Sequence, residues 1–114
     1  MSHAAIPPTP APYLRLITER IVQQFQPLKI ILFGSYARGD ATADSDLDLL
    51  IVMPSGTHKR QQAIAIGQAL ADVPISKDII VTTPEEIATY GHLVGTILRP
   101  ALREGTALYE RATS

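Results

Sequence analysis

Two aspartates at the start of an apolar segment are the residues whose spacing most clearly suggests chemistry. Asp46 and Asp48 are separated by one residue and open the apolar stretch 47–52. Side chains two positions apart on a strand lie on the same face, so these carboxylates should lie side by side. Close carboxylates raise each other's pKa unless a cation lies between them. The pair therefore predicts a site for a hard divalent cation, Mg²⁺ or Mn²⁺, which takes oxygen ligands and often completes its shell with phosphate.

A glycine and a serine supply a matching site for an anion. Gly34 and Ser35 follow the apolar stretch 30–33. Gly34 has no side chain to keep a ligand from the backbone, and Ser35 begins a short segment whose free N–H groups and hydroxyl can hold a phosphate. Strands on both sides would bring the anion site and the cation site to adjacent strand ends. This combination is what a metal-bridged nucleoside triphosphate requires.

These elements together resemble the signature of a known superfamily. Gly-Ser-Tyr-Ala-Arg-Gly at 34–39, followed by Asp-Ser-Asp-Leu-Asp-Leu-Leu at 44–50, resembles the DNA polymerase beta-like nucleotidyltransferases. The amino-acid sequence of these motifs is most similar to the minimal branch of the superfamily, often called MNT. The resemblance covers roughly residues 14–111. It implies an α/β (α+β) nucleotidyltransferase fold, in which helices pack on one face of a small mixed β-sheet and the active site lies on the other.

The resemblance also implies the roles of the acids. Asp46 and Asp48 would hold two Mg²⁺ ions, with Mn²⁺ as an alternative. The third carboxylate of such sites comes from a neighbouring strand, and Asp78 is the acid placed inside a later apolar segment. Asp78 would share the first metal, and whether it also acts as general base stays open. AMP would pass from ATP to a hydroxyl, and pyrophosphate would leave.

The phosphate side of the site follows from the same resemblance. Gly34 and Ser35 would steady the outer phosphates of ATP through a hydroxyl and backbone N–H groups. Arg38 could contact a phosphate, although pairing with Asp40 or Asp44 fits its position equally well. The next residue after the serine, a tyrosine at position 36, could line the site.

Plainer roles are open to each of these residues. The aspartate pair could cap a turn at a solvated strand entrance, and the glycine-serine pair could be an ordinary turn with a helix cap. Asp78 follows Lys77 and could be a surface strand acid. Asp44 fits the role of a loop residue better than that of a ligand.

Members of the minimal branch typically act with a small helical HEPN protein as a toxin-antitoxin pair. The resemblance therefore implies an antitoxin that adenylylates a hydroxyl, expected to be a tyrosine, of its HEPN toxin. Two alternatives are a transferase for a small molecule or an RNA end, and a non-catalytic antitoxin that acts by steric masking.

Composition sets outer limits on these functions. The 114 residues, with a formal net charge of −1, fit one domain, expected at 13–114 behind a flexible proline-rich leader at 1–12. The charge gives no strong case for direct nucleic-acid binding. There is no cysteine, and no apolar run reaches the length of a membrane span. We therefore expect a cytoplasmic protein with no membrane partner.

Hydrophobic periodicity and turn residues predict the elements that position the site. The first three predicted helices are 13–26, a short one that ends at about residue 39, and 58–72. A fourth starts at Pro84 with Thr83 as its cap. A last helix is kinked at Pro100, ends near Gly105 and carries the apolar residues Leu93, Ile97, Ala101 and Leu102. The predicted strands are 28–33, 46–53, 75–82 and 106–110.

Overall fold

The computed structural model describes residues 11–93 and 95–112. The predicted leader lies outside these residues except for its last two positions, which belong to the first helix. The helices are α1 (Ala11–Phe25), α2 (Ser35–Arg38), α3 (Lys59–Ala69), α4 (Pro84–Tyr90) and α5 (Leu98–Glu104). The strands are β1 (Lys29–Phe33), β2 (Leu47–Val52), β3 (Lys77–Thr82) and β4 (Thr106–Glu110).

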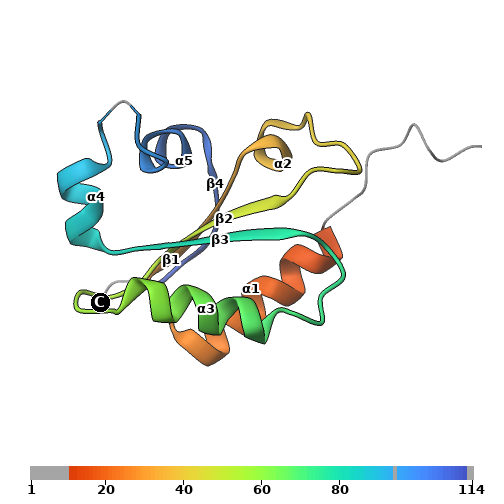
Figure 1. Cartoon of the computed structure of the whole chain (residues 1–114), viewed down its shortest axis with the longest axis horizontal. Helices are drawn as coiled ribbons and strands as arrows, with labels where there is room; N and C mark the ends of the chain where they lie inside the picture. The colour runs from red at the N-terminus through yellow and green to blue at the C-terminus, as the bar shows by residue number, and fades with distance from the viewer. Residues whose placement is uncertain (1–10, 94, 113–114) are drawn as a thin grey trace, which may run out of the picture.

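The four strands form one mixed sheet in the order β3-β2-β1-β4 (Figure 1). β1 pairs antiparallel with both β2 and β4, and β2 pairs parallel with β3. Parallel neighbours need a crossover connection, which α3 supplies between β2 and β3. The small mixed sheet expected from the sequence is confirmed.

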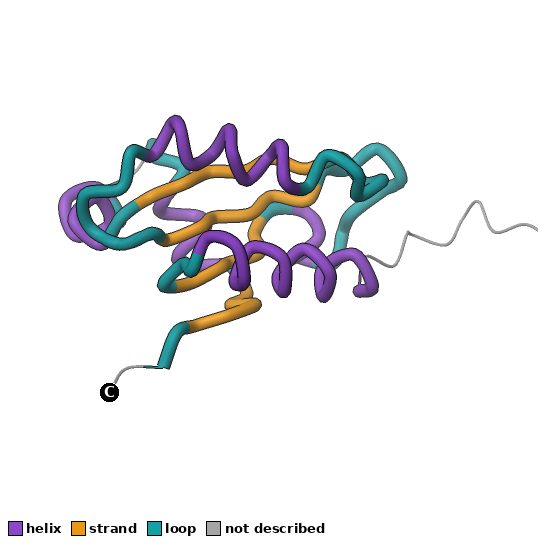
Figure 2. Tube along the Cα trace, turned by 90° about the horizontal axis from the view of Figure 1, so that it is seen from below, coloured by secondary structure: helices purple, strands orange, loops and turns teal. Residues whose placement is uncertain are grey.

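The two long helices cover one face of the sheet. Ile17 and Ile21 of α1 and Ile66 of α3 are fully buried against alternate residues of β2, among them Leu47 and Leu49. In Figure 2, which looks at the molecule from below, the strands are visible between these two helices. Burial of this apolar face is the main source of stability for helices of such length.

The opposite face is covered in part by α5. Leu98 and Ala101 pack against Ile31, Phe33 and Leu50 in a second, smaller core. The long helices thus occupy one face, as expected, and the face expected to carry the site also holds α5 beside it (Figure 1). The site must lie on the part of this face that α5 leaves open.

The predicted last helix begins later than its apolar pattern suggested. Leu93 and Ile97 precede α5 and are exposed, because Gly95 has a φ of 95°, which no right-handed helix contains. Pro100 falls in the first turn of α5, where the missing N–H removes no helical hydrogen bond. Pro100 therefore fits into α5 without the kink that the sequence predicted there.

The start of α4 provides a test of local stability. The side chain of Thr83 accepts a hydrogen bond from the backbone N–H of Glu86 at 3.3 Å, and Pro84 is the first helical residue. Thr83→Ala should lower the free energy of unfolding by about 1 kcal/mol, measured by urea denaturation, because it removes this cap. Thr83→Ser keeps the hydroxyl and should restore most of the loss. Equal losses in the two variants would mean that the cap contributes little.

None of the helices in the described ranges has both the length and the apolar character that crossing a membrane requires.

Candidate active site

The alternation of β2 decides where its acid points. Leu47, Leu49 and Ile51 are fully buried toward α1 and α3, so Asp48 and Leu50 face the other side of the sheet. Asp46 comes one residue before the strand and is exposed, whereas Asp48 is half-buried. The carboxylate of Asp48 therefore lies on the face that α5 covers only in part.

The register of the parallel pair brings in the third acid. Asp48 lies directly opposite Asp78 in the ladder between β2 and β3. Residues opposite each other in a ladder share a face, and Ile80, two positions further, contacts the smaller core on that face. The structure thus places Asp78 on the same side of the sheet as Asp48, as the sequence predicted, on an edge strand where it is exposed.

Gly34 lies against the carboxylate of Asp48. It follows β1, whose last residue, Phe33, is opposite Asp48 in the antiparallel ladder. Its backbone has φ 76° and ψ −155°, a conformation essentially confined to glycine. A Cβ added at this position would be 2.1 Å from Oδ2 of Asp48. Only glycine lets the turn and the acid approach this closely.

Ser35 begins the single turn of α2 directly after this glycine. The N–H groups of Ala37 and Arg38 donate to the carbonyl of Gly34 at 3.1 and 3.0 Å, and Gly39, with φ 86°, ends the turn. The first N–H groups of a helix have no acceptor within it. Ser35 and these N–H groups directly follow the glycine that lies against Asp48, and this is the segment that the sequence predicted as the anion site.

The three acids interact electrostatically. The pKa of Asp48 is raised, chiefly because partial burial disfavours its charge, and further because the carboxylates of Asp78 and Asp46 repel it. Arg38 partly offsets this rise. Like charges held this close favour the binding of a cation between them.

The chemistry of the donors fits a hard divalent cation. All three side chains offer carboxylate oxygens, which Mg²⁺ and Mn²⁺ prefer. No three His, Asp or Glu side chains within 11–93 and 95–112 are gathered into a ready metal cluster. The acids are neighbours on one face rather than a preformed cage.

Arg38 is engaged with a neighbouring acid in the structure. Its Nε donates to Oδ2 of Asp40 at 3.3 Å, and both side chains are exposed. This is one of the two roles that the sequence leaves open for the arginine. Arg38 nevertheless lies near enough to lower the pKa of Asp48, so it contributes positive charge to the site.

Comparison with known proteins identifies the family. The family model described as "Nucleotidyltransferase domain" matches residues 14–101. The chain belongs to this family. The assignment made from the glycine-serine and aspartate motif is thereby confirmed, as is its placement among enzymes of the nucleotidyltransferase type.

The similar proteins are of two kinds. A putative protein adenylyltransferase of Methanocaldococcus jannaschii is 38% identical over 74 residues, which cover 55% of this chain and 74% of that protein. A second protein of the same description and organism is 79% identical over 24 residues, only 21% of this chain and 24% of that protein's length. The crystal structure of a putative nucleotidyltransferase from Sulfolobus solfataricus superposes with a TM-score of 0.61, at 22% identity over 89% of this chain and 83% of that one, which supports the shared fold.

Beside the acids of this nucleotidyltransferase domain is a hollow of about 530 Å³. Its lining includes Asp46, Asp44 and the two tyrosines Tyr13 and Tyr36. The sequence indicated Tyr36 as a residue that could line the site. It gave no signal for Tyr13, which reaches the hollow from the start of α1 through the tertiary fold.

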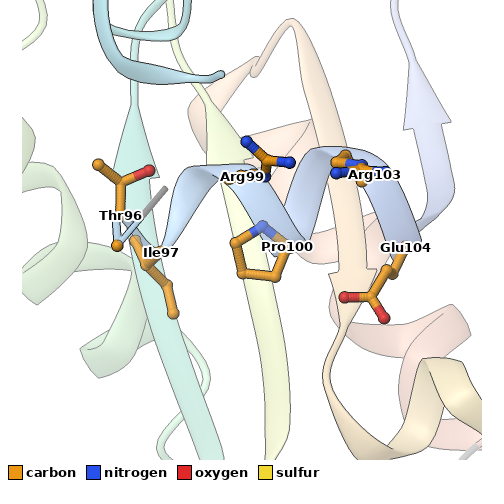
Figure 3. Close-up of a pocket in the computed structure, with 7 residues that line it drawn as sticks. Thr96, Ile97, Arg99, Pro100, Arg103 and Glu104 are labelled. Carbon is orange, nitrogen blue, oxygen red and sulfur yellow. The ribbon is translucent and has the colours of Figure 1, made fainter. Parts of the chain in front are cut away.

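A second hollow, of about 910 Å³, runs along α5. Its lining includes Arg99 and Arg103, which project from one side of the helix, while Pro100 and Glu104 project from the other (Figure 3). The Nη1 of Arg99 donates to the carbonyl of His92 at 3.1 Å. None of the acids described above lines this hollow, so it is separate from the candidate active site.

Proposed function

We propose that this nucleotidyltransferase transfers AMP from Mg·ATP to a hydroxyl group of a partner protein. The observation that carries the proposal is the position of Asp48, which lies opposite Asp78 across one ladder and against Gly34 at the turn after β1. Two carboxylates for a metal and a glycine turn for phosphate therefore meet at one point. This arrangement supports binding of a metal-bridged triphosphate.

Each residue of the site would have its own role in the transfer. Asp46, Asp48 and Asp78 would hold Mg²⁺, or Mn²⁺, which when bound neutralises charge on the triphosphate and makes the acceptor hydroxyl more acidic. Asp78 would take the hydroxyl proton. The acceptor oxygen bonds to the α-phosphorus of ATP as the bond to pyrophosphate breaks. Ser35, and N–H groups at the start of α2, would stabilise the outer phosphates.

Two observations favour a protein acceptor. The similar proteins of M. jannaschii are named as protein adenylyltransferases. The described surface also carries exposed apolar side chains at Tyr90, Leu93 and Ile97, on and between α4 and α5, of the kind that a protein partner covers. We further propose that the acceptor is a tyrosine of a HEPN-type toxin and that the chain is its antitoxin.

The alternatives receive less support from the site. A transferase acting on an RNA end would benefit from positive charge near the acids, yet the hollow next to them is lined by Asp44 and Asp46. A non-catalytic antitoxin would have no need for glycine against Asp48. A small-molecule acceptor is compatible with the same acids, and the experiment below distinguishes it from a protein acceptor.

The experiment takes as candidate acceptor any small all-helical protein whose gene neighbours that of this chain. It is incubated with the purified chain, ATP and Mg²⁺, and its mass is measured by mass spectrometry. We expect one or more adenylyl groups on a tyrosine, and no adduct with the Asp48→Asn variant or with EDTA. The double variant Glu19→Gln/Glu104→Gln changes exposed carboxylates on α1 and α5 and should leave the adduct in place. Full protection of cells by Asp48→Asn, with no adduct from the wild type, would establish masking instead.

A further inference from the structure

The hollow beside Asp46 is formed by segments far apart in the sequence. Tyr13 comes from α1, Tyr36 from α2, Ser45 and Asp46 from the loop before β2, and Ser76 from the loop before β3. Its volume of about 530 Å³ is in the usual range for small-molecule sites. Because Asp46 belongs both to this lining and to the group of acids, a ligand could extend from one into the other.

The loop on one side of the hollow is held by its own hydrogen bonds. The backbone N–H of Thr42 donates to Oγ of Ser45 at 2.8 Å, and the N–H of Ser45 donates back to the carbonyl of Thr42 at 3.1 Å. The N–H of Asp44 donates to Oγ1 of Thr42 at 3.3 Å. These bonds hold the backbone of the loop, from which the exposed side chain of Asp44 extends into the lining of the hollow.

The loop on the other side is held from β3. Nζ of Lys77 donates to the carbonyls of Val73 at 2.9 Å and Ile75 at 2.7 Å. The N–H of Leu47 donates to the carbonyl of Ser76 at 2.9 Å, which joins this loop to β2. Both loops are therefore in place before a ligand arrives, and binding would require little reorganisation.

The lining determines which part of a nucleotide it suits. Tyr13 and Tyr36 are half-buried and pack against the core between the sheet and helices α1 and α3, so their rings are restrained. The lining contains the carboxylates of Asp44 and Asp46 and, among the residues that the structure describes there, no Lys, Arg or His. Phosphate is disfavoured by this charge. A neutral planar ring with N–H donors is favoured, because it can contact the tyrosines and donate to a carboxylate.

We propose that this hollow binds the base of the nucleoside triphosphate, and that Asp44 accepts a hydrogen bond from an exocyclic amino group such as that of adenine. The proposal rests on the proposed function and assigns the base to one side of Asp46 and the phosphates to the other. Tyr36 directly follows Ser35, so base and phosphate would contact consecutive residues of α2. Tyr13 and Tyr36 are binding residues here and Asp44 a specificity residue.

Isothermal titration calorimetry with three ligands tests this assignment in the presence of Mg²⁺. ATP carries the base, inosine triphosphate replaces its amino group by a carbonyl, and inorganic tripolyphosphate has neither base nor ribose. Tyr13→Leu and Tyr36→Leu should each weaken ATP binding about tenfold, because each removes one aromatic contact to the base. Tripolyphosphate binding should be unchanged, and Tyr36→Phe, which keeps the ring, should bind ATP like the wild type.

Asp44→Ala addresses the amino group. The wild type should bind ATP more tightly than inosine triphosphate, by about tenfold, since the carbonyl of inosine would face a carboxylate. Asp44→Ala should remove this preference and leave the affinity for tripolyphosphate unchanged. Circular dichroism of each variant confirms that it is folded.

The possible outcomes separate this inference from the function on which it rests. Loss of ATP affinity in both leucine variants, with tripolyphosphate binding kept, supports the base site. Unchanged ATP affinity in both variants overturns it, and slower transfer to the acceptor in that case would assign the hollow to the acceptor side chain. If the wild type binds neither ATP nor tripolyphosphate, the nucleotidyl-transfer proposal itself fails, and the base site fails with it.

Discussion

Gly34→Ala is expected to lower the rate of adenylyl transfer by about 100-fold or more, the loss found when one charge-stabilising group is misplaced. A methyl group at this position would be 2.1 Å from Oδ2 and 3.0 Å from Cγ of Asp48. Because these atoms belong to a side chain, Asp48 can rotate away and relieve the clash. That rotation would move the carboxylate from its place opposite Asp78, so the variant loses the site while most of the fold remains.

Gly39→Ala is the matched control for this change. Gly39 also has a positive φ, 86°, at the other end of the same short helix, but an added Cβ would have no atom within 4 Å. We expect Gly39→Ala to cost about 1 kcal/mol of stability and Gly34→Ala about 1–3 kcal/mol. Activity per folded molecule, with the folded fraction taken from urea denaturation, should be near normal in Gly39→Ala and strongly reduced in Gly34→Ala. Similar activities for the two variants would show that contact with Asp48 is unimportant.

Asp48→Asn should abolish adenylyl transfer and at the same time stabilise the fold at neutral pH. The change keeps the shape of the side chain and removes a charge that partial burial disfavours most and that Asp78 and Asp46 also repel. The stabilisation should be at most about 1 kcal/mol, because the group is partly exposed and solvent screens these repulsions. Mg²⁺ should raise the melting temperature of the wild type, and this shift should be lost in Asp48→Asn, since a ligand stabilises the state that binds it.

The pH dependence follows from the raised pKa of Asp48. The folded protein holds this proton at a higher pH than the unfolded chain, whose pKa is near the ordinary 3.8. The stability linked to the protonated group is therefore complete below about this value and is lost as the pH rises through the raised pKa of the folded state. The stability gap between Asp48→Asn and wild type should close as the pH falls toward 3.8. Urea denaturation across this range measures it, and a gap that widens at low pH would contradict the assigned direction.

Local patterns in the sequence were sufficient to predict most of the fold and the face of the sheet on which Asp48 and Asp78 lie. Alternation placed Asp48 on the face away from Leu47 and Leu49, and an acid inside an apolar strand singled out Asp78. The turn between the first two strands could be predicted because glycine followed by serine at the end of an apolar run strongly favours a turn.

What the sequence could not supply is the long-range contact. The first turn of α1 brings Tyr13 to the hollow beside Asp46, and no local pattern encodes this approach. The late start of α5 is likewise hidden, because the apolar spacing of Leu93 and Ile97 fits a helix. The positive φ of Gly95 outweighs that spacing. Tertiary packing and a single glycine decided these two points.

β3 lies at the edge of the sheet, so the part of the site on this strand should open more readily than the part on the central strands. Asp48 lies on β2 and Gly34 directly follows β1, and each of these central strands has a neighbour on both sides. Asp78 lies on β3, which within the described residues pairs with β2 alone. Transient opening of the protein should begin at such a margin. Molecules caught in that opened form would keep Gly34 and Asp48 in place for a triphosphate but would lack Asp78, the group proposed to deprotonate the acceptor. Nucleotide occupancy would then outlast turnover as the temperature rises.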